Sequence, residues 1–576
     1  MSEPVEPTAP RAPIDPTEAV QPPRQRSLGR AGLVVASGTL VSRLLGFVNA
    51  LLLYNTIGAV GQGADAFVLA NTLPNNIYLI IAGGTLSAVI VPAIVRSVAD
   101  GDGGARFLNR LVTLGVSVFA VVAIAVTVAA PLVVQLYAQS GSDGGFAPGQ
   151  LELAIAFAYW CLPQVFFYAV IAILSEVLNA KGRFWPYAWT PVVNNLVLAA
   201  VLIGFRTAFG EVAARPASAW TPEMITLLAG GATLGVVIQT LALVIAFRQA
   251  GLRVRPDFHW RDAGLGRFGR LAAWTFGATL VSQAAGVFES NVLSLATGSA
   301  SIAAMTLSQA IYILPYSIVT ISIAVPYFTR MSGHAQAGNR VALGADLTNA
   351  VTAVLLFQVF FAVAMAITAP WIATLFTSEP GGRAAVAAVL ACTLIGLVPA
   401  SVSGVLLRGW YALDDTRTPF FLQTTQVALY VGALVLIAAV RPPVDVIAVA
   451  TALSLAGAIL VYAVLSLALI RRKVPALRVS RVLGRLGWFL AAMVPAAALG
   501  WWLSARVLGG TELGAYPDGT AGGALVVILV TGLAMLVVYL GVLLATRSPE
   551  LGTFLRPIRA RLARRGGESS GPGDSE

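Results

Sequence analysis

Long apolar runs alternate with short polar gaps along nearly the whole chain after residue 30. About 20 apolar residues cross the hydrocarbon core of a bilayer, and fourteen runs meet that length. The predicted spans lie near 31–58, 65–95, 108–137, 151–178, 186–205, 222–247, 270–296, 301–329, 344–375, 384–411, 418–440, 444–470, 485–508 and 521–546. The pattern therefore predicts an all-α polytopic membrane protein with 14 transmembrane helices.

The basic residues fall mainly in alternate gaps. With the amino terminus in the cytoplasm, 30 of the 37 lysine and arginine residues lie on that side of the membrane. Five lie outside, namely Arg206, Arg215, Arg383, Arg441 and Arg506, and Arg43 and Arg408 lie within spans. Cytoplasmic gaps of membrane proteins carry the excess of positive charge. We therefore predict a multi-pass protein of the cell (plasma) membrane with both termini in the cytoplasm.

Composition removes several classes of function. At 57% hydrophobic residues and a mean hydropathy of +0.81, the chain cannot be a soluble globular protein. The net charge of +11 reflects membrane topology, so nucleic acid is excluded as a partner. Cys161 and Cys392 lie inside apolar runs, and the two histidines lie in cytoplasmic gaps. Without a Walker A motif or a catalytic constellation, the sequence predicts neither an enzyme nor a metal or cofactor site.

A short motif recurs in the two halves of the chain. Thr39-Leu40-Val41-Ser42 in the first span returns as Thr279-Leu280-Val281-Ser282 in the seventh, and Val91-Pro92 returns as Val325-Pro326. Six spans separate each pair, and because six is even the repeats are parallel, related by an axis along the membrane normal. This predicts two six-helix lobes facing each other across a central cavity, with the last two spans as an addition.

The repeat and the polar segments together predict the domain organisation. We expect a disordered cytoplasmic arm at 1–30, an N-lobe at 31–248, a cytoplasmic linker at 249–270, a C-lobe at 271–470, an added pair of helices at 485–546, and a basic, then disordered, tail at 547–576. The linker carries aromatic residues among arginines, which favours an amphipathic helix lying on anionic membrane lipid. Topology alone accounts for most of its charge.

Three charged residues within or at the start of spans are candidates for function. A charge at the bilayer centre costs about 2.5 to 3.5 kcal/mol on insertion scales, so Arg43 is predicted to face a polar cavity rather than to snorkel to the inner surface. Asp65 opens the second span, where a carboxylate is either a cavity residue or a helix cap. Glu289 lies seven residues after Gln283 and near the same helix face, as a coupling-cation candidate or as a hydrogen-bonding residue between helices.

Several motifs resemble one family of membrane transporters. These are SGTLVSRLLGF, GADAFVLANTLPN, RFWPYAWTPVVNN, FHWRDAGLGRFGRL and DDTRTP, which together extend over almost the whole chain past residue 30. They are similar to the MurJ (MviN) lipid II flippases of the multidrug/oligosaccharidyl-lipid/polysaccharide exporter superfamily. The resemblance implies alternating-access export of the undecaprenyl-linked peptidoglycan precursor from the inner to the outer leaflet, for peptidoglycan and cell-wall biogenesis and cell shape. It also implies that the added pair forms a groove for the lipid tail.

The resemblance assigns Arg43 to the family's first essential arginine and Asp65 to its cavity aspartate. Further charged positions of the family are replaced here by Asn49, Tyr78, Leu79, Gly83 and Ala310. A pyrophosphate is best held by several guanidinium groups, and this cavity is predicted to keep one. The predicted substrate-binding set therefore combines charges with amides: Arg43, Asp65, Asn49, Asn75, Asn76, Gln283 and Gln309.

The sequence is compatible with three functions. The first is a lipid II flippase without a cofactor, coupled to sodium, protons or the membrane potential. The second keeps the architecture but carries another polyprenyl-linked glycan, or acts as a multidrug/cation antiporter. The third is a non-transporting membrane scaffold that recruits cell-wall synthesis proteins. The fewer arginines favour the second reading, whereas the two extra spans argue against a plain antiporter.

Overall fold

The computed structural model describes residues 25–82, 105–139, 145–213, 215–252, 254–259, 266–296, 298–377, 379–507 and 520–552 of the chain. Its first helices, here the N-half, are α1 (Gln25–Ile57), α2 (Gln62–Ala82), α4 (Ala105–Val128), α5 (Ala130–Tyr137), α6 (Pro148–Cys161), α7 (Gln164–Ala180), α8 (Phe184–Phe209), α9 (Pro222–Ile225) and α10 (Gly231–Gln249). A π-helical turn, η2 (Thr226–Gly230), joins α9 to α10.

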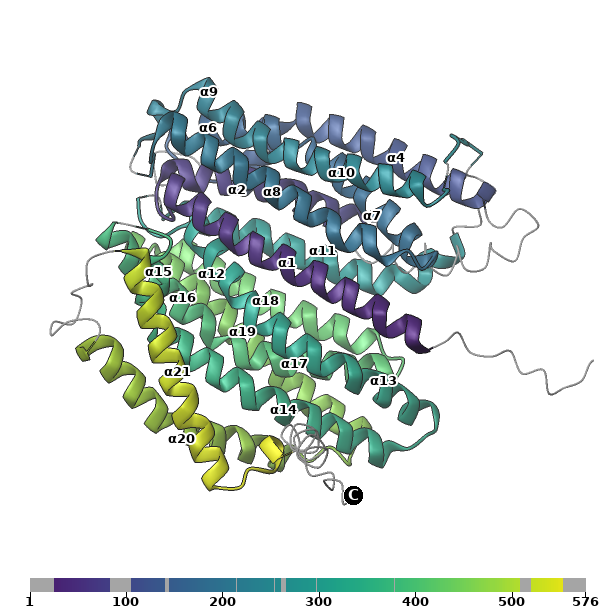
Figure 1. The fold of residues 1–576 in the computed structure, drawn as a ribbon, viewed down its shortest axis with the longest axis vertical. Coiled ribbons are helices and arrows are strands. Elements are labelled where there is room, and N and C mark those ends of the chain that lie inside the picture. The colour runs from purple at the N-terminus through teal and green to yellow at the C-terminus, as the bar shows by residue number, and fades with distance from the viewer. Residues whose placement is uncertain are drawn as a thin grey trace, which may run out of the picture.

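The following helices form the C-half and the added pair. The C-half contains α11 (Gly266–Ser294), α12 (Ile302–Pro315), the π-helix η4 (Tyr316–Ile321), α13 (Ser322–Gln336), α14 (Arg340–Ile367), α15 (Ala369–Thr374), α16 (Pro380–Ile395), α17 (Leu397–Ala412), α18 (Arg417–Val440) and α19 (Val444–Lys473). The added pair is α20 (Val479–Trp502), with the π-helical turn η5 (Leu503–Val507), and α21 (Ala521–Ala545). Figure 1 shows the N-half above the C-half and the added pair along the lower left edge.

Twelve helical segments of the described residues are long and apolar enough to cross a membrane. The other two predicted spans, at 65–95 and 270–296, coincide with α2 and α11, which are helical but more polar. α2 carries Asp65 and three asparagines, and α11 carries Glu289 among other polar residues. The all-helical membrane fold is therefore confirmed, and the count of fourteen stays a prediction.

Several predicted boundaries differ from the helix ends. α1 begins at Gln25, inside the predicted disordered arm at 1–30, because this segment is rich in residues that favour helix and extends α1 beyond its apolar run. α11 begins at Gly266, inside the predicted linker, and α20 at Val479. Residues 1–24, most of the predicted amphipathic segment at 260–265, and 553–576 of the tail lie outside the described residues, as does Val91-Pro92.

The internal repeat is visible in how the helices pack. α1 packs along α8, and its counterpart α11 packs along α18. The pairs α4 with α7 and α14 with α17 correspond in the same way, as do α2 with α6 and α12 with α16. Ser42 and Ser282, which end the repeated motif, both accept hydrogen bonds from an amide on the partner helix: Asn195 Nδ2 at 3.1 Å and Gln423 Nε2 at 3.4 Å. The repeated motif thus fixes the same helix pairing in each half.

The two ends of the bundle differ in charge. Arg110, Arg248, Arg330, Lys473 and Arg485 lie near the helix ends on one side, here called the basic end. Ile57 and Gln62, between α1 and α2, lie on the other side, here called the opposite end.

The apolar cores show where the halves are joined. One cluster of buried residues at the opposite end contains Tyr54 and Leu73 from the N-half together with Ala303 and Phe376 from the C-half. At the basic end the N-half has its own cluster, around Leu174, and the C-half has another, around Leu347 and Trp410, which includes Phe489 of the added pair. Among the residues that the structure describes, the halves therefore share a core at the opposite end and have separate cores at the basic end.

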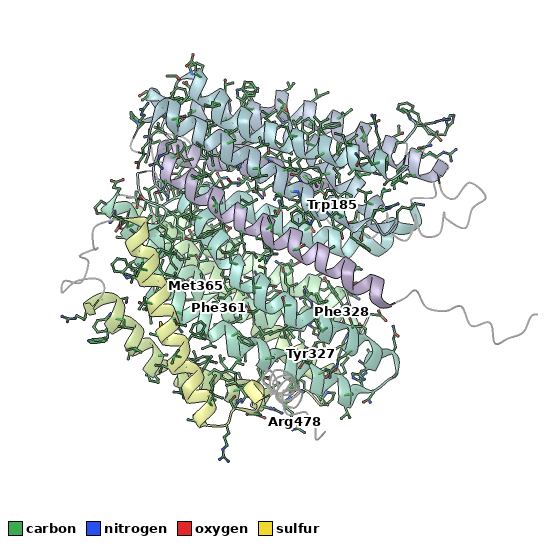
Figure 2. All side chains as sticks on the ribbon, viewed as in Figure 1. Trp185, Tyr327, Phe328, Phe361, Met365 and Arg478 are labelled. Carbon is green, nitrogen blue, oxygen red and sulfur yellow. The ribbon has the colours of Figure 1, made fainter. Side chains whose placement is uncertain are left out.

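The added pair is attached to the C-half through α14. The hydroxyl of Tyr539 in α21 donates to the carbonyl of Leu356 at 2.9 Å, and its ring stacks on Phe360 with 6.0 Å between centroids. Phe361 and Met365, also on α14, are labelled in Figure 2 close to where α21 crosses the C-half. The added pair therefore packs on the C-half.

A close approach of α1 to α8 depends on Gly38. A Cβ atom at this position would lie 2.6 Å from the carbonyl oxygen of Ala188, a backbone atom that cannot rotate away. We expect Gly38→Ala to destabilise the fold by about 1 to 3 kcal/mol, the usual effect of overpacking, measured as thermal unfolding of the purified protein in detergent. Gly46→Ala in the same helix is the matched control, because the nearest atom there is 3.9 Å away. Equal unfolding temperatures of the two variants would contradict this account.

Candidate functional site: the seam between the halves

Asp65 joins the halves at the opposite end. It lies in the first turn of α2 and is buried, and its Oδ1 accepts a hydrogen bond of 2.9 Å from the backbone N–H of Ala303 in α12. The first N–H groups of a helix lack partners within that helix, so Asp65 caps α12 from the other half. The hydroxyl of Tyr54 donates to the carbonyl of the same Ala303 at 3.4 Å. The two contacts hold α12 against both α1 and α2.

The loop after α15 adds further contacts between the halves at the opposite end. Asn55 Nδ2 donates to the carbonyl of Leu375 at 2.6 Å. The ring of Phe376 makes edge-to-face contacts with Phe47 and Tyr54, with centroids 5.8 Å and 6.2 Å apart. Polar and aromatic contacts from α1 therefore reinforce the shared apolar core at this end.

Two hydrogen bonds cross between the halves farther from the contacts of Asp65 and Phe376. The interface that they form, through Arg43, Ser317, Asn76 and Gln283, is here called the seam. The guanidinium of Arg43 in α1 donates to the hydroxyl of Ser317 in η4. Gln283 Nε2 in α11 donates to the carbonyl of Asn76 in α2 at 3.1 Å. Arg43 directly follows Ser42, and Gln283 directly follows Ser282, so the two side chains occupy equivalent positions of the repeat. The repeat therefore produces two related links, one based on a charge and the other on an amide.

Arg43 is exposed in the structure, although it contacts Ser317. A hydroxyl is a neutral partner, so the positive charge is not neutralised by this contact. An exposed guanidinium within an apolar span keeps donors available for an anionic ligand. Arg43 is thus a cation near the middle of α1 that lies between the halves and can bind an anionic ligand.

The structure distributes the other predicted residues over three places. Asn76 and Gln283 lie on the seam, and Asn75 is exposed on α2 beside Asn76. Asn49 is buried and donates to the carbonyl and the side-chain oxygen of Asn195 in α8, at 2.9 Å and 3.1 Å. In this structure Asn49 therefore joins α1 to α8 within the N-half, and its predicted part in substrate binding stays a prediction.

Gln309 forms a separate polar group with Glu289. Its Nε2 donates to Glu289 Oε1 at 2.8 Å, which links α12 to α11. The hydroxyl of Tyr430 in α18 is close to the same carboxylate. Glu289 occupies the repeat position of Asn49, because each lies seven residues after the repeated serine. One half thus carries a neutral amide where the other carries a carboxylate.

Sequence reasoning missed Ser317, the partner of Arg43. A signal was present: Thr72-Leu73 followed by Ile77-Tyr78 in the second span recurs as Thr306-Leu307 followed by Ile311-Tyr312 in the eighth. Aligning these segments places η4 at the repeat position of residues 82–87, of which 83–87 lie outside the described residues. What the alignment lacks is the π-helical turn that follows Pro315 and decides which side chains of η4 face α1.

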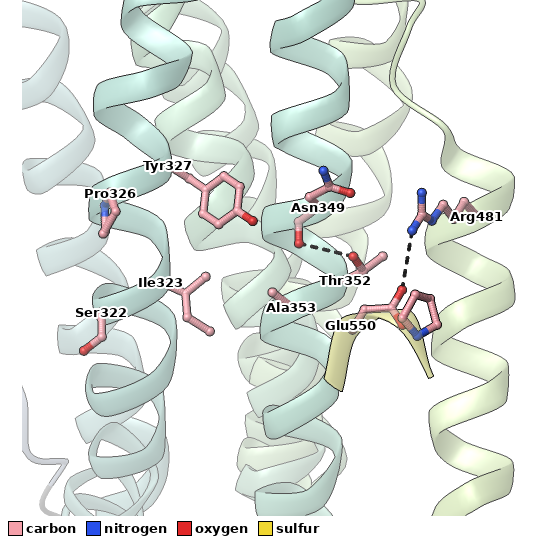
Figure 3. A pocket seen from close by; sticks show the side chains of 10 residues that line it. Ser322, Ile323, Pro326, Tyr327, Asn349, Thr352, Ala353, Arg481 and Glu550 are labelled. Carbon is pink, nitrogen blue, oxygen red and sulfur yellow. Dashed lines mark hydrogen bonds and ion pairs between the residues drawn. The ribbon is translucent and has the colours of Figure 1, made fainter. Parts of the chain in front are cut away.

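A pocket of about 410 Å³ lies where the added pair meets the C-half (Figure 3). α13 provides Tyr327, α14 provides Asn349, and α20 provides Arg481. Glu550, which follows α21, is buried and forms ion pairs with Arg485 and, at 3.7 Å, with Arg481. Glu550, in the first residues of the predicted basic tail, thus pairs with α20, and the prediction for the rest of the tail stays a prediction. The pocket combines an apolar wall with hydroxyl, amide, guanidinium and carboxylate groups.

The family model and the following two curated relatives are all described as lipid II flippases MurJ. The family model described as "Lipid II flippase MurJ" matches residues 55–517. The probable lipid II flippase MurJ of Haemophilus influenzae is 28% identical over 407 residues, which are 66% of this chain and 75% of that protein. The one of Vibrio cholerae is 32% identical over 285 residues, covering 48% of this chain and 51% of that protein.

Solved structures share the fold at low identity. A lipid II flippase MurJ in an inward closed conformation matches with a TM-score of 0.69 and 18% identity, covering 91% of this chain and 99% of that chain. An inward-facing multidrug resistance MATE family transporter of the MOP superfamily matches with a TM-score of 0.60 and 16% identity, over 77% and 98% of the chains. With a family model that covers most of its length, the chain belongs to the lipid II flippase MurJ family.

Proposed function

We propose that this protein is a lipid II flippase that moves the lipid-linked peptidoglycan precursor from the inner to the outer leaflet by alternating access. Family membership supports the substrate. The way the halves are joined supports alternating access, because in the described part of the chain they share a core at the opposite end and have separate cores at the basic end. With the basic end in the cytoplasm, as positive residues favour, the halves are proposed to separate at that end and to open a cavity toward the cytoplasm.

Arg43 has the central role in this proposal. A pyrophosphate carries negative charge, and a guanidinium offers it two parallel hydrogen bonds. Arg43 is exposed near the middle of α1, and the amides of Asn75 and Asn76 on α2 and of Gln283 on α11 are proposed as additional neutral donors. Amides supply hydrogen bonds without charge, so the head group is held by one cation and several neutral groups.

The proposal is tested with the purified protein in liposomes that contain lipid II. The measurement is the fraction of lipid II that becomes accessible to an impermeant lipid II-modifying enzyme outside the liposomes. Time-dependent exposure of lipid II confirms the function and excludes a mere scaffold. Exposure of another polyprenyl-pyrophosphate glycan, with lipid II unmoved, assigns a different cargo to the same architecture. In the native host, depletion of the protein is expected to lower the lipid II exposed at the cell surface.

Glu289 is proposed as the coupling site for a proton or sodium ion. The support is its carboxylate within a membrane helix, bound by Gln309 and close to Tyr430 instead of a basic residue. We expect Glu289→Gln to remove the dependence of transport on an imposed sodium or proton gradient while lipid II still binds. The measurement is the transport rate in liposomes with and without the gradient, with Asn49→Asp as the comparison at the repeat-related position. A gradient response equal to that of the unmodified protein would reject this role.

The pocket beside the added pair supports a route for the lipid tail. Its lining combines apolar atoms with Tyr327 and with Arg481, which is paired with Glu550, so the pocket offers a polyprenyl chain an apolar wall beside a polar boundary. The tail is proposed to lie along the added pair while the head group occupies the seam. Cell-wall synthesis proteins remain proposed partners.

A further inference from the structure

The N-half contains a second cavity, away from the seam and from the added pair. Its volume is about 640 Å³, within the range of roughly 300 to 1,000 Å³ that small-molecule sites occupy. Three helices form its walls: α4 through Val112, α7 through Val170 and Leu174, and α10 through Val244 and Phe247. These side chains are all apolar, so the interior suits a hydrocarbon chain rather than a free anion.

The loop after α10 forms the remaining wall. Leu252 and Val254 line the cavity from this loop. The chain reverses at Gly251, whose φ of +78° favours glycine. The backbone N–H of Arg255 then donates to Asn109 Oδ1 in α4 at 2.9 Å. The loop is therefore fixed against the start of α4, and the cavity is a built feature of the fold.

Asp257 attaches the loop to α4 at a second point. The backbone N–H of Asp257 donates to the hydroxyl of Thr113 at 3.0 Å, and its carboxylate pairs with Arg110 at 3.1 Å. The backbone N–H and the ring of His259, followed by Arg110, lower the pKa of Asp257 to about 2. This carboxylate stays ionised at physiological pH and is engaged away from the cavity.

Two arginines provide the only charged side chains of the described lining. Arg248 lies in the last turn of α10, and Arg255 lies in the loop, and both are exposed. Both lie at the basic end, where the helix ends are expected to meet the cytoplasmic leaflet. Long basic side chains place their stems on apolar surface and their charged groups at the polar boundary. The site thus combines an apolar interior with two cations.

We propose that this cavity binds an anionic glycerophospholipid, with an acyl chain between α4, α7 and α10 and the phosphate between Arg248 and Arg255. The match is one of chemistry, since a phospholipid is apolar where the cavity is apolar and negative where it is positive. The bound lipid is a component of the folded N-half, whereas the transported lipid is handled at the seam. It would connect the fixed loop to the ends of three spans.

The test uses the full-length protein in phosphatidylcholine nanodiscs titrated with phosphatidylglycerol, with bound lipids counted by native mass spectrometry. A basic residue near an anionic membrane surface contributes about 1 kcal/mol, or roughly fivefold in affinity. We expect Arg248→Gln and Arg255→Gln each to weaken binding about fivefold, and the double variant about 30-fold. The control is the double variant Lys181→Gln and Arg183→Gln, which removes two charges from the same end without touching the cavity lining. It should keep the affinity within about twofold, since it leaves both lining arginines in place.

Further arms identify the ligand. Val244→Phe, which fills the apolar interior, is expected to displace the lipid while both arginines remain. The lipid proposal is overturned if inorganic phosphate competes as well as phosphatidylglycerol, if phosphatidylcholine binds equally, or if the charge-matched control loses as much affinity as the arginine variant. It is also overturned if lipid II displaces the bound phospholipid from this cavity, because the site would then belong to the transported substrate.

Discussion

Replacing Arg43 by alanine is expected to lower lipid II transport about 10- to 150-fold while the protein still folds. Hydrogen bonds to charged groups contribute about 1.5 to 3 kcal/mol each, and every 1.4 kcal/mol is a factor of ten. Arg43 is exposed and contacts only a neutral hydroxyl among the hydrogen bonds described for it. Its loss should therefore remove a phosphate ligand without leaving a buried charge unpaired. Transport in proteoliposomes and thermal unfolding, measured on the same preparation, separate the two effects.

Two further variants distinguish substrate binding from the link between the halves. Ser317→Ala removes the hydroxyl that Arg43 contacts and leaves the guanidinium in place, so most transport should remain. Arg43→Lys keeps the charge but loses the planar fork of donors, and an intermediate rate is expected. If Ser317→Ala and Arg43→Ala lower transport equally, the residue acts through the inter-half contact and not on the substrate.

Replacing Asp65 by alanine is expected to favour a state in which the halves separate at the opposite end, where they share a core in this structure. The backbone N–H of Ala303 would lose its buried partner, at a cost of about 1 to 3 kcal/mol. That cost falls on the closed state, so the balance between states shifts about 5- to 150-fold toward the open one. Asp65→Asn keeps an oxygen acceptor for the same N–H and should shift the balance less.

The shift is measurable as a distance between spin labels. Cysteines introduced at Thr207 in α8 and Val444 in α19 place one label on each half near the opposite end, and both positions are exposed. Cys161 and Cys392 would first be replaced. We expect a longer-distance population to grow in Asp65→Ala and to stay minor in Asp65→Asn. An unchanged distance distribution in Asp65→Ala would show that the cap does not hold the halves together.

The membrane fold could be predicted from the sequence because each span depends only on the hydrophobicity of consecutive residues. A span needs about 20 apolar residues whatever its neighbours are, and the repeated Thr-Leu-Val-Ser motif lies in the chain itself. α2 and α11 show the limit of this reasoning. They are helices at two of the predicted spans, yet their polar residues make them less apolar than the other spans. Those polar residues include Asp65, which joins the halves, and Gln283, which crosses between them.

The candidate site was only partly readable. Arg43 was identified by its rarity, since a charge within a span needs a polar surrounding. Asn49 and Gln309 were grouped with it by residue type, but the structure gives Asn49 to Asn195 and Gln309 to Glu289. An amide binds whichever polar group lies within about 3 Å, and the sequence does not specify that neighbour. Ser317 was missed because its direction depends on a π-helical turn.

The apolar pattern, the repeated motif and the family motifs were sufficient to establish a helical membrane protein with two related halves that resembles the MurJ flippases. These properties depend on hydrophobicity and on motifs that are carried by neighbouring residues. Three features became evident from the packed helices alone: the halves share a core at one end, Asp65 caps α12 from the other half, and two arginines flank an apolar cavity in the N-half. Each of these features joins residues from helices far apart in the chain, and their contacts depend on how the helices pack in three dimensions.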